Sequence, residues 1–342
     1  MTRLQRDLDE ILERSRDDFE TLRGARLYVT GGTGFVGSWM LESFVWANQR
    51  LALGARACVL TREADAFSRR VPHVGNDATV TLVVGDVREA ARVGGTFDAI
   101  VHAATPASAK MNAETPHIMV DTIIDGMRHT LDLAARSGAI PVLLTSSGAV
   151  YGRQPLDVRN VHETYLGAPD QLDPANAYHE AKRLSELQLA IGARESGIGA
   201  KVARLFAFVG PYLPLDRHFA IGNFIRAAIA AQTIEILGDG TPLRSYLYAG
   251  DMTSWLWRVL ARGESGRAYN IGSERSVSIA ETARVVAACV EPTGSIALRG
   301  VPTGAVPERY VPSTQRARDE LGLAEWTSLE ESIRRTIAFA RT

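Results

Sequence analysis

The sequence predicts an α/β fold, with a doubly wound parallel sheet and a smaller C-terminal lobe. Short apolar runs alternate with helix-like segments from residue 26 to about residue 206. These runs are continuously apolar, which is typical of parallel strands that helices cover on both faces. Beyond about residue 211 the alternation breaks into shorter segments. A chain of 342 residues is long enough for one large α/β unit and an additional lobe.

The expected elements largely alternate along the chain. Residues 3–22 come first and carry an apolar stripe at helical spacing, so this helix docks either on the main domain or on a partner subunit. The expected strands are 26–30, 56–61, 80–84, 98–102, 140–146 and 202–206. The expected helices are 35–50, 115–137, 177–196 and 219–232, with further segments near 250–262, 277–290 and 328–340.

Charge and cysteine usage argue against several classes of protein. The formal net charge is -1 at pH 7, so no global basic field favours nucleic acid or an anionic membrane. The N-terminus is charged rather than apolar, and no apolar run is long enough to span a bilayer. Cys58 and Cys289 lie far apart, without the spacing of a disulfide framework or a metal site. We therefore expect a cytoplasmic protein with no metal, nucleic-acid or membrane partner.

A glycine-rich loop, GGTGFVG, follows the first expected strand and precedes a helix. Its glycines fit both G-x-G-x-x-G and G-x-x-G-x-x-G. Such glycines permit a tight turn, let a pyrophosphate approach the backbone, and let helix and strand pack closely. The helix N-terminus then offers its N–H groups and its dipole to the anion. We therefore predict a Rossmann-type sheet that binds a dinucleotide at Gly31, Gly34, Phe35, Val36 and Gly37.

The end of the second expected strand bears on which dinucleotide binds. An acid at this position would hold the adenosine ribose of NAD. Thr61 stands there instead and Arg62 follows, which suits the 2′-phosphate of NADP(H). Glu63 and Asp65 are nearby and keep NAD(H) as the alternative.

Two further loops complete the predicted cofactor site. Asp86 and Val87 follow the third strand and are placed to contact the adenine ring. Ala103 and Ala104 follow the fourth strand and are included among the cofactor-binding residues.

Tyr178 and Lys182 are four residues apart, so on a helix they share one face. A tyrosine with the ordinary pKa of about 10 is a poor base at neutral pH. A nearby ammonium favours the phenolate and lowers that pKa. Ser147 directly follows the fifth expected strand, at the edge where open α/β sheets place their chemistry. The pattern indicates a site for acid–base chemistry.

Eight motifs in order then resemble one enzyme family. They are TGGTGFVG, GDV, HAATPAS, TSSGAVYG, YHEAKR, RLFAFVGP, GDGTPLRSYLYAGD and YNIGS. The set resembles the extended short-chain dehydrogenase/reductases that act on nucleotide sugars, which include UDP-galactose 4-epimerase, dTDP-glucose 4,6-dehydratase and UDP-glucuronate decarboxylase. The resemblance runs from about residue 25 to the C-terminus. HAATPAS and YHEAKR look most like the decarboxylase branch.

The resemblance implies roles for three catalytic residues. Ser147 would hydrogen-bond the reacting sugar hydroxyl, and Tyr178 would be the base. Lys182 would hold the nicotinamide ribose and tune Tyr178, so Tyr178 and Lys182 also belong to the cofactor site. The implied step is oxidation at sugar C4, or in reverse the reduction of a 4-keto sugar.

The residues just before Val-Tyr-Gly bear on the type of reaction. The family's dehydratases carry Asp-Glu there, and its decarboxylases carry Glu directly before Val-Tyr-Gly. This chain has Gly148 and Ala149, which favours an epimerase or a 4-keto-sugar reductase. A dehydratase or decarboxylase with a displaced carboxylate is the first alternative, and a non-catalytic dinucleotide sensor is the second. The carboxylates considered for displacement are Glu163, Glu180 and Asp216.

The resemblance also implies a substrate side, and arginine's fork suits a nucleotide diphosphate. Its members are Ser108, Ser147, Asn223, Arg244 and Arg309. Three departures point to an unusual sugar or nucleotide: Ala207 replaces a substrate-contacting asparagine, Ile123 replaces another, and the substrate loop contains Asp216, Arg217 and His218.

These motifs divide the chain into three expected parts. Residues 1–24 are an N-terminal helical extension, and 25–210 are the dinucleotide-binding Rossmann domain with the catalytic residues. Residues 211–342 are mainly a substrate-binding lobe, interleaved with that domain. The family's habit further implies a homodimer through the helices at 115–137 and 177–196.

Overall fold

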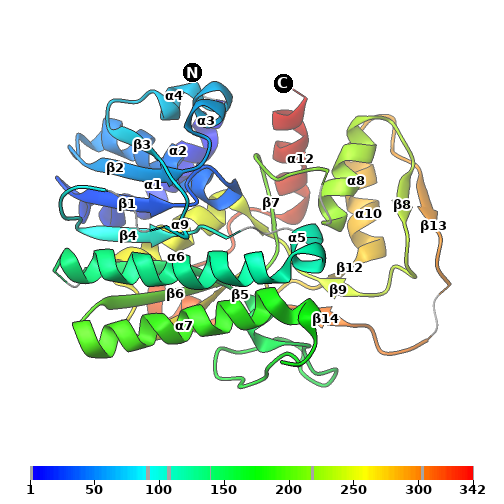
Figure 1. Cartoon of the computed structure of the whole chain (residues 1–342). Coiled ribbons are helices and arrows are strands. Elements are labelled where there is room, and N and C mark those ends of the chain that lie inside the picture. Colours follow the sequence, from blue (N-terminus) through cyan, green and yellow to red (C-terminus); the bar gives the residue numbers. More distant parts are fainter. Residues whose placement is uncertain are drawn as a thin grey trace. The chain divides into compact units, whose positions relative to one another are not determined.

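The computed structural model of the chain describes residues 3–89, 93–105, 109–138, 140–216, 219–301 and 304–341. The chain forms two units (Figure 1). Unit 1 comprises residues 1–150, 169–204 and 253–269, and unit 2 comprises 151–168, 205–252 and 270–342. Residues 151–168, which the sequence assigned to the Rossmann domain, thus group with unit 2. Residues 253–269, which the sequence assigned to the lobe, group with unit 1.

Unit 1 is built on a seven-stranded parallel sheet, which confirms the predicted fold class. The strand order is β11-β6-β5-β4-β1-β2-β3, and β1 pairs in parallel with both β2 and β4. The strands are β1 (Arg26–Thr30), β2 (Arg56–Thr61), β3 (Val80–Val84), β4 (Ala99–His102), β5 (Pro141–Ser147), β6 (Gly199–Leu205) and β11 (Arg267–Ile271). Six strands match predicted ones within three residues; the edge strand β11 was not predicted.

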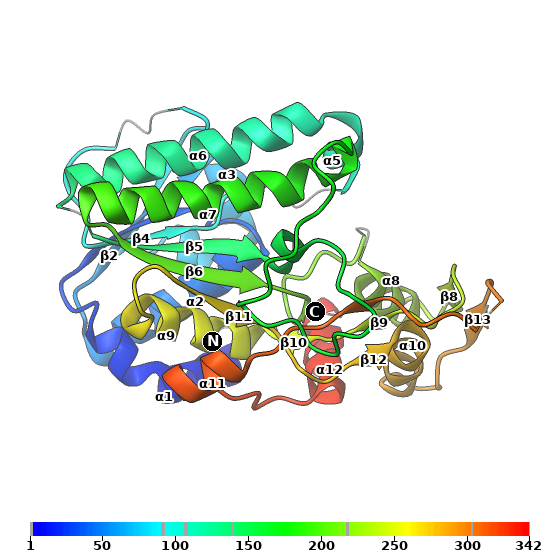
Figure 2. The same cartoon turned by 90° about the horizontal axis from the view of Figure 1, so that it is seen from below.

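Helices cover both faces of this sheet, as the apolar strands require (Figures 1 and 2). One face carries α6 (Pro116–Arg136) and α7 (Ala177–Ser196), which pack along each other. The other face carries α1 (Gln5–Glu20), α2 (Phe35–Leu51) and α9 (Ala249–Arg262). Between the sheet and α6 and α7 lies an apolar core that includes Tyr28, Ile100, Met127, Val142 and Leu189.

Short helices flank the sheet of unit 1. They are α3 (Ala64–Arg70) and α4 (Pro72–Gly75) between β2 and β3, and α5 (Ala109–Glu114) before α6. A 3₁₀ turn, η1 (Gly148–Tyr151), follows β5, and another, η2 (Pro174–Asn176), precedes α7. The carboxyl of Asp173 caps η2 by accepting a 2.9 Å hydrogen bond from Ala175 N, which fixes where the helical segment starts.

The N-terminal helix α1 docks on unit 1 itself, which decides between the two sites expected for its apolar stripe. Leu8, Ile11 and Phe19 are buried, and the Phe19 ring lies 5.0 Å from the ring of Trp257 on α9. The buried Asp18 carboxylate accepts hydrogen bonds from Arg258 (2.5 Å) and from Arg262 of the same helix. Apolar packing and ion pairs together therefore hold α1 against α9 and α2.

In its described residues, unit 2 combines four helices with short groups of two or three strands. Its helices α8 (Ala220–Ile229), α10 (Ile279–Ala288) and α12 (Leu329–Ala340) share an apolar core, and α11 (Gln315–Leu321) lies between α10 and α12 in the chain. A capping box between Ser278 and Glu281 starts α10. The strand groups are β7 (Phe208–Val209) with β10 (Leu247–Tyr248), β8 (Ile234–Ile236) with β13 (Ile296–Leu298), and β9 (Leu243–Arg244) with β12 (Val277–Ser278) and β14 (Arg309–Tyr310).

Candidate active site

The predicted dinucleotide loop connects β1 to α2 at the carboxyl edge of the sheet. Gly31 has a φ of +69°, and a Cβ there would lie 2.4 Å from the carbonyl carbon of Ala103. A Cβ on Gly37 would lie 2.3 Å from Gly31 O. Positions 31 and 37 therefore have no room for a side chain, because the loop, the end of β4 and the start of α2 lie in contact there. Helix α2 has Gly34 as its N-cap and no side chain caps it, so its N-terminus fits the diphosphate of a dinucleotide.

The end of β2 presents hydroxyls and arginines. Thr61 is buried, and its Oγ1 lies 3.3 Å from Thr33 Oγ1 in the glycine loop. Arg62 follows it and is exposed. Arg70, at the end of α3, donates a 2.5 Å hydrogen bond to Thr33 O and so brings a second guanidinium to this part of the loop. Arg70 was missed because only the fold brings α3 back to β1.

The loops after β3 and β4 reach the same edge. Ala103 and Ala104 both donate backbone hydrogen bonds to Thr30, at 3.0 and 3.3 Å. Asp86 forms a 2.9 Å ion pair with Arg88, and the hydrogen bond from Arg88 lowers the pKa of the Asp86 carboxyl. Val87 follows it in the chain. Apart from Tyr178 and Lys182 on α7, the residues predicted to bind the cofactor thus lie at or just after the carboxyl ends of four neighbouring strands, β1 to β4.

The structure brings the three predicted catalytic residues together within unit 1. Ser147 is the last residue of β5, and Tyr178 and Lys182 lie one turn apart on α7. The Tyr178 hydroxyl and the Ser147 side chain are hydrogen-bonded. Ser147 Oγ also accepts a 3.1 Å hydrogen bond from Ala149 N, which fixes its orientation.

Lys182 is held by two acceptors that the sequence did not reveal. Its Nζ donates 2.7 Å hydrogen bonds to Thr105 Oγ1, in the loop after β4, and to the carbonyl oxygen of Thr145 on β5. Tyr178 is anchored through its backbone N–H, which donates to Asn112 Oδ1 on α5 at 3.0 Å. The Lys182 side chain on α7 is therefore held by hydrogen bonds to β5 and to the loop after β4.

Burial dominates the ionisation of this group. It raises the pKa of Tyr178 above its usual value, opposite to the lowering expected from Lys182, and the hydrogen bond from Ser147 offsets part of the rise. Burial also lowers the pKa of Lys182 to about 7, and the Glu186 carboxylate opposes that fall. His102 on β4 is fully buried with a pKa of about 3, so it is neutral, and its Nδ1 lies 2.9 Å from the hydroxyls of Thr30 and Thr130.

A partly buried ion pair lies near this lysine. The Glu186 carboxylate on α7 accepts hydrogen bonds from Arg204 on β6, the closest at 2.7 Å, and from Ser146 Oγ at 2.5 Å. Glu186 follows Lys182 by four residues, a spacing that could have signalled it. Its partner Arg204 could be identified only from the fold.

The positions before Val-Tyr-Gly lie in η1 and carry no acid–base group, since they are Gly148 and Ala149. Of the carboxylates considered as replacements, Glu163 accepts a 2.9 Å hydrogen bond from Asn270 N within unit 2. Asp216 is an exposed residue of unit 2. Glu180 lies on α7, 3.6 Å from Arg183. Within unit 1, no hydrogen bond joins Glu180 to Ser147, Tyr178 or Lys182 in the described part of the chain.

Unit 2 brings two of the predicted substrate residues onto neighbouring strands. In the β9–β14 pair, Tyr310 lies opposite Arg244 and Arg309 lies opposite Leu243. The Arg309 Nε is buried and has no hydrogen-bond partner among the described residues. Asn223 lies half-buried on α8. Ser108, Arg217 and His218 lie outside the described residues.

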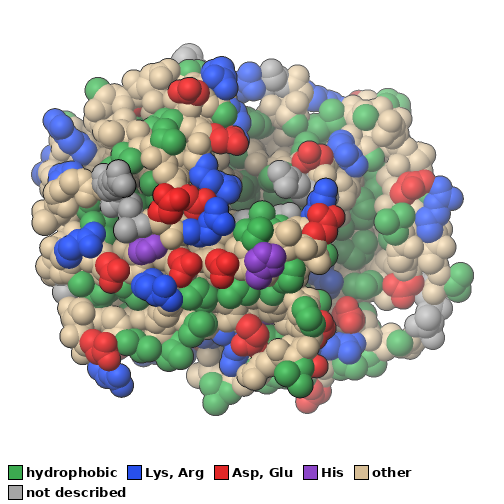
Figure 3. Space-filling model, in the orientation of Figure 1, with side chains coloured by type: hydrophobic (Ala, Val, Ile, Leu, Met, Phe, Trp, Pro, Cys, Tyr) green, Lys and Arg blue, Asp and Glu red, His purple; other side chains and the backbone are tan. Residues whose placement is uncertain are grey.

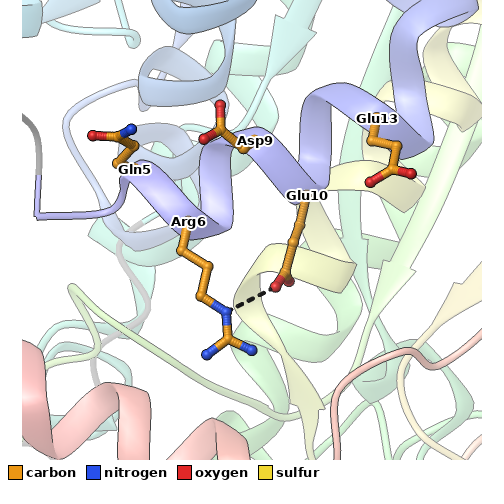
Figure 4. A pocket seen from close by; sticks show the side chains of 5 residues that line it. All are labelled: Gln5, Arg6, Asp9, Glu10 and Glu13. Carbon is orange, nitrogen blue, oxygen red and sulfur yellow. Dashed lines mark hydrogen bonds and ion pairs between the residues drawn. The ribbon is translucent and has the colours of Figure 1, made fainter.

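A shallow depression on α1 has different chemistry (Figure 4). Gln5, Arg6, Asp9, Glu10 and Glu13 line it. Arg6 donates to Glu10, and Asp9 accepts from the Trp46 indole. Because its lining comes from one face of α1, carries three carboxylates against one arginine, and has that arginine paired with Glu10, it does not fit a nucleotide diphosphate. Among the described residues no His, Cys, Asp and Glu cluster could hold a metal, and no helix is long and apolar enough to cross a membrane.

This geometry agrees with the comparison with known families. The model of the NAD-dependent epimerase/dehydratase family matches residues 27–272, more than half of the chain. The chain belongs to this family. It is an enzyme of the extended short-chain dehydrogenase/reductase type, which confirms the resemblance drawn from its motifs.

Curated relatives of this family member are decarboxylases. UDP-glucuronic acid decarboxylase 2 of Arabidopsis thaliana is 29% identical over 311 residues, covering 91% of the chain and 67% of the relative. UDP-glucuronic acid decarboxylase 1 of Xenopus tropicalis is 28% identical over 316 residues, covering 92% of the chain and 72% of the relative.

Solved structures share the fold across nearly the whole chain. A dTDP-glucose 4,6-dehydratase of Streptomyces venezuelae, solved with NAD bound, has a TM-score of 0.78 and 25% identity, covering 92% of this chain and 97% of its own. A UDP-glucose 4-epimerase of Thermotoga maritima, solved with UDP-glucose, has a TM-score of 0.77 and 21% identity, covering 92% and 98%.

Proposed function

We propose that this enzyme is a nucleotide-sugar epimerase or 4-keto-sugar reductase that transfers hydride at sugar C4. One observation carries the proposal: the Tyr178 hydroxyl is hydrogen-bonded to Ser147 and Lys182 lies one turn further along the same helix, while Gly148 and Ala149 after Ser147 carry no acid–base group. Proton removal from a sugar hydroxyl needs a base such as Tyr178. Elimination of water needs an acid–base pair, which Gly148 and Ala149 cannot supply.

The chain's own residues would handle the proton. Ser147 Oγ and the Tyr178 hydroxyl orient the sugar's C4 hydroxyl, and Tyr178 accepts its proton as the C4–H bond breaks. Lys182 favours the phenolate form of Tyr178 by its positive charge and donates to the nicotinamide ribose. A bound NAD(P) supplies the hydride acceptor. In the reverse step Tyr178 returns the proton to the C4 oxygen.

A decarboxylase is the second candidate, and the curated relatives favour it. After oxidation at C4, a carboxylate on C5 would be β to a ketone. Its C–C bond breaks with the electrons passing into an enolate, so carbon dioxide leaves without a separate acid. A proton must then return to C5. Gly148 and Ala149 therefore argue more strongly against dehydration than against decarboxylation.

The form of the cofactor belongs to the same proposal. The family is NAD-dependent, and the related dehydratase binds NAD. In this chain Thr61 replaces the ribose-binding acid, and Arg62 and Arg70 bring positive charge to the loop. A 2′-phosphate would be attracted by both guanidinium groups. We therefore propose NADP(H) as the favoured cofactor, with NAD(H) as the alternative.

The substrate proposed for the site is a nucleotide-diphosphate sugar. Arg244 and Arg309 are the proposed diphosphate clamps, and their neighbouring strands support a joint role. The unpaired, buried Nε of Arg309 is a donor that an anion would satisfy. Asn223 and Ser108 remain proposed contacts to the nucleotide and the sugar.

A homodimer through α6 and α7 is proposed as the assembly. Large apolar side chains on α7 stay exposed in the single chain, namely Leu184, Leu187 and Ile191. Figure 3 shows hydrophobic side chains running along these two helices. A second copy would cover them.

The reaction is tested by incubating the protein in deuterated water with a panel of UDP- and dTDP-hexoses and UDP-glucuronate, and with a nucleotide 4-keto sugar together with NAD(P)H. An epimerase that removes and returns hydride at C4 incorporates no solvent deuterium at carbon. Deuterium at C5 of a product that has lost water or carbon dioxide would reject the first proposal in favour of elimination or decarboxylation. Tight dinucleotide binding without turnover of any substrate would instead support a dinucleotide sensor.

A further inference from the structure

The arginine of the RLFAFVGP motif has no role in the proposed reaction. Arg204 nevertheless makes a bidentate ion pair, from Nε and Nη2, to the Glu186 carboxylate at 3.0 and 2.7 Å. Both side chains are largely buried, at 16% and 15% exposed. A partly buried pair of this kind stabilises a fold less than its charges suggest, because withdrawing both ions from water is costly. Its position therefore calls for another explanation.

Glu186 lies where three elements of the candidate active site meet. On α7 it follows Lys182 by four residues, so the two side chains share one face of the helix. Its carboxylate also accepts a hydrogen bond from Ser146, the neighbour of Ser147 on β5. Arg204 completes the junction from β6, which is adjacent to β5 in the sheet.

We propose that the Glu186–Arg204 pair is a positioning device that fixes α7 against β5 and β6 and sets the charge state of Lys182. The proposal rests on the proposed function only for the catalytic use of Lys182; the placement of the two ions stands without it. Glu186 and Arg204 are positioning residues, since they act through Lys182 and Ser146.

The two ions should act on Lys182 in opposite directions. The charged and titratable groups that face the lysine in the described chain are Tyr178 and Glu186 on α7 and the neutral His102 on β4, with Arg204 behind Glu186. Glu186 favours the ammonium form, and this opposes the effect of burial. The positive charge of Arg204 offsets part of the attraction between the Glu186 carboxylate and the Lys182 ammonium. Loss of Glu186 therefore destabilises the ammonium, and loss of Arg204 stabilises it.

The test measures the titration of Lys182 directly, in the cofactor-free protein. The chain has three lysines, Lys110, Lys182 and Lys201, so a sample labelled with carbon-13 at lysine Cε gives three resonances. Single Lys110→Arg and Lys201→Arg variants assign them. The titration midpoint of Lys182, the pH at which half of its side chains are protonated, is expected near pH 7 in the unaltered protein. It should fall by about one pH unit in Glu186→Gln and rise in Arg204→Gln.

The control removes a carboxylate from the same helix but leaves the contacts among Glu186, Arg204 and Ser146 intact. Glu195 on α7 is exposed and pairs with Arg194, so Glu195→Gln should leave the Lys182 midpoint unchanged. Shifts of the same sign in Glu186→Gln and Arg204→Gln, or no shift in either, would overturn the proposal. A merely structural pair could lower stability in both variants but would not produce opposite titrations.

Removing one partner of a buried ion pair is strongly destabilising, so a single variant could unfold. The double variant Glu186→Leu with Arg204→Met replaces both ions by apolar groups and keeps the volume filled. Its Lys182 midpoint should fall below that of the unaltered protein, because the double variant removes the Glu186 carboxylate, which is the charge that raises the pKa of Lys182. An unchanged midpoint in a folded double variant would also overturn the proposal.

Turnover then separates this inference from the proposed function. If hydride transfer fails altogether, the proposed function is wrong, whereas the Lys182 titrations still decide the role of the ion pair. If turnover occurs, the pH at which kcat falls on the alkaline side should move with the titrations, downward in Glu186→Gln and upward in Arg204→Gln. A kcat profile that stays fixed while the titrations shift would overturn the link to Lys182.

Discussion

Lys182 donates a 2.7 Å hydrogen bond from its Nζ to the hydroxyl of Thr105, across from its bond to the Thr145 carbonyl. The threonine stands in the loop after β4, and the lysine stands on α7. This bond therefore ties the loop that would border the cofactor to the helix that carries the candidate base. A buried ammonium needs such acceptors, because each unmet donor carries a desolvation cost.

Replacing Thr105 by valine tests that tie. Thr105→Val keeps the shape and removes the acceptor, so the ammonium is less well held and kcat should fall about tenfold. Steady-state kinetics should show little change in KM for the sugar. The control is Thr115→Val, which removes a hydroxyl bonded only weakly, at 3.3 Å, to Met111 O. Equal kinetics for Thr105→Val and the unaltered enzyme would contradict the role given to Thr105.

Tyr178→Phe tests the candidate base. The substitution removes the phenolic oxygen that would take the hydroxyl proton, so turnover should fall about 10²- to 10⁴-fold. Dinucleotide binding, measured by calorimetry, should persist because the glycine loop is intact. Tyr165→Phe, on a half-buried tyrosine of unit 2, is the matched control and should retain turnover. Full activity in Tyr178→Phe would reject this residue as the base.

The glycine loop offers a matched pair of substitutions. Gly31→Ala should abolish dinucleotide binding and destabilise the fold, because its φ is +69° and the new Cβ would meet the Ala103 backbone at 2.4 Å. Gly24→Ala has a similar φ of +71° with nothing within 4 Å of the Cβ. It should cost only the backbone strain, about 1–2 kcal/mol, and keep binding. Urea unfolding and dinucleotide titration measure both effects.

Arg62→Ala tests the form of the cofactor. If Arg62 contacts a 2′-phosphate, its loss should weaken NADP(H) binding by about tenfold or more and leave NAD(H) binding unchanged. Arg69→Ala removes another exposed arginine nearby, on α3, and serves as the control. The measurement is the ratio of the two dissociation constants. A ratio that favours NAD(H) in the unaltered protein would reject the NADP(H) proposal.

The His73–Glu42 pair predicts a pH dependence of stability. A 2.7 Å hydrogen bond to the buried Glu42 carboxylate raises the pKa of His73 above its ordinary value of 6.5. The stabilisation is therefore fully present below the unfolded-state pKa and is lost as the pH rises through the higher folded-state pKa. The urea midpoint should fall over that range in the unaltered protein, whereas His73→Gln should show a flatter profile. Parallel profiles would contradict this account.

Much of the fold and part of the candidate site follow from local sequence. The glycine loop and the Tyr178–Lys182 pair are encoded by spacing within one segment, so their elements were predicted within a residue or two. The partners of Lys182 were not, because Thr105 and Thr145 reach it only when α7 packs on the sheet. Strand β11 was missed because RAYNI mixes polar and apolar residues at a sheet edge.

The docking of α1 shows a second limit of sequence reasoning. Its apolar stripe would suit a partner subunit as well as the chain's own helices. Only the fold reveals Trp257 and Arg258 on α9 as the contacts that complete it. Likewise, Arg204 is a motif residue whose partner, Glu186, is identified by the adjacency of β5, β6 and α7.

The most direct test of the central claim follows the hydrogen on C4. UDP- and dTDP-hexoses and UDP-glucuronate deuterated at C4 are incubated with the enzyme, and mass spectrometry and NMR locate the label in the product. Hydride transfer out of and back to C4 predicts a product that keeps deuterium at C4, formed by the unaltered enzyme and not by Tyr178→Phe. Deuterium found at C6, or lost to water, would contradict the account.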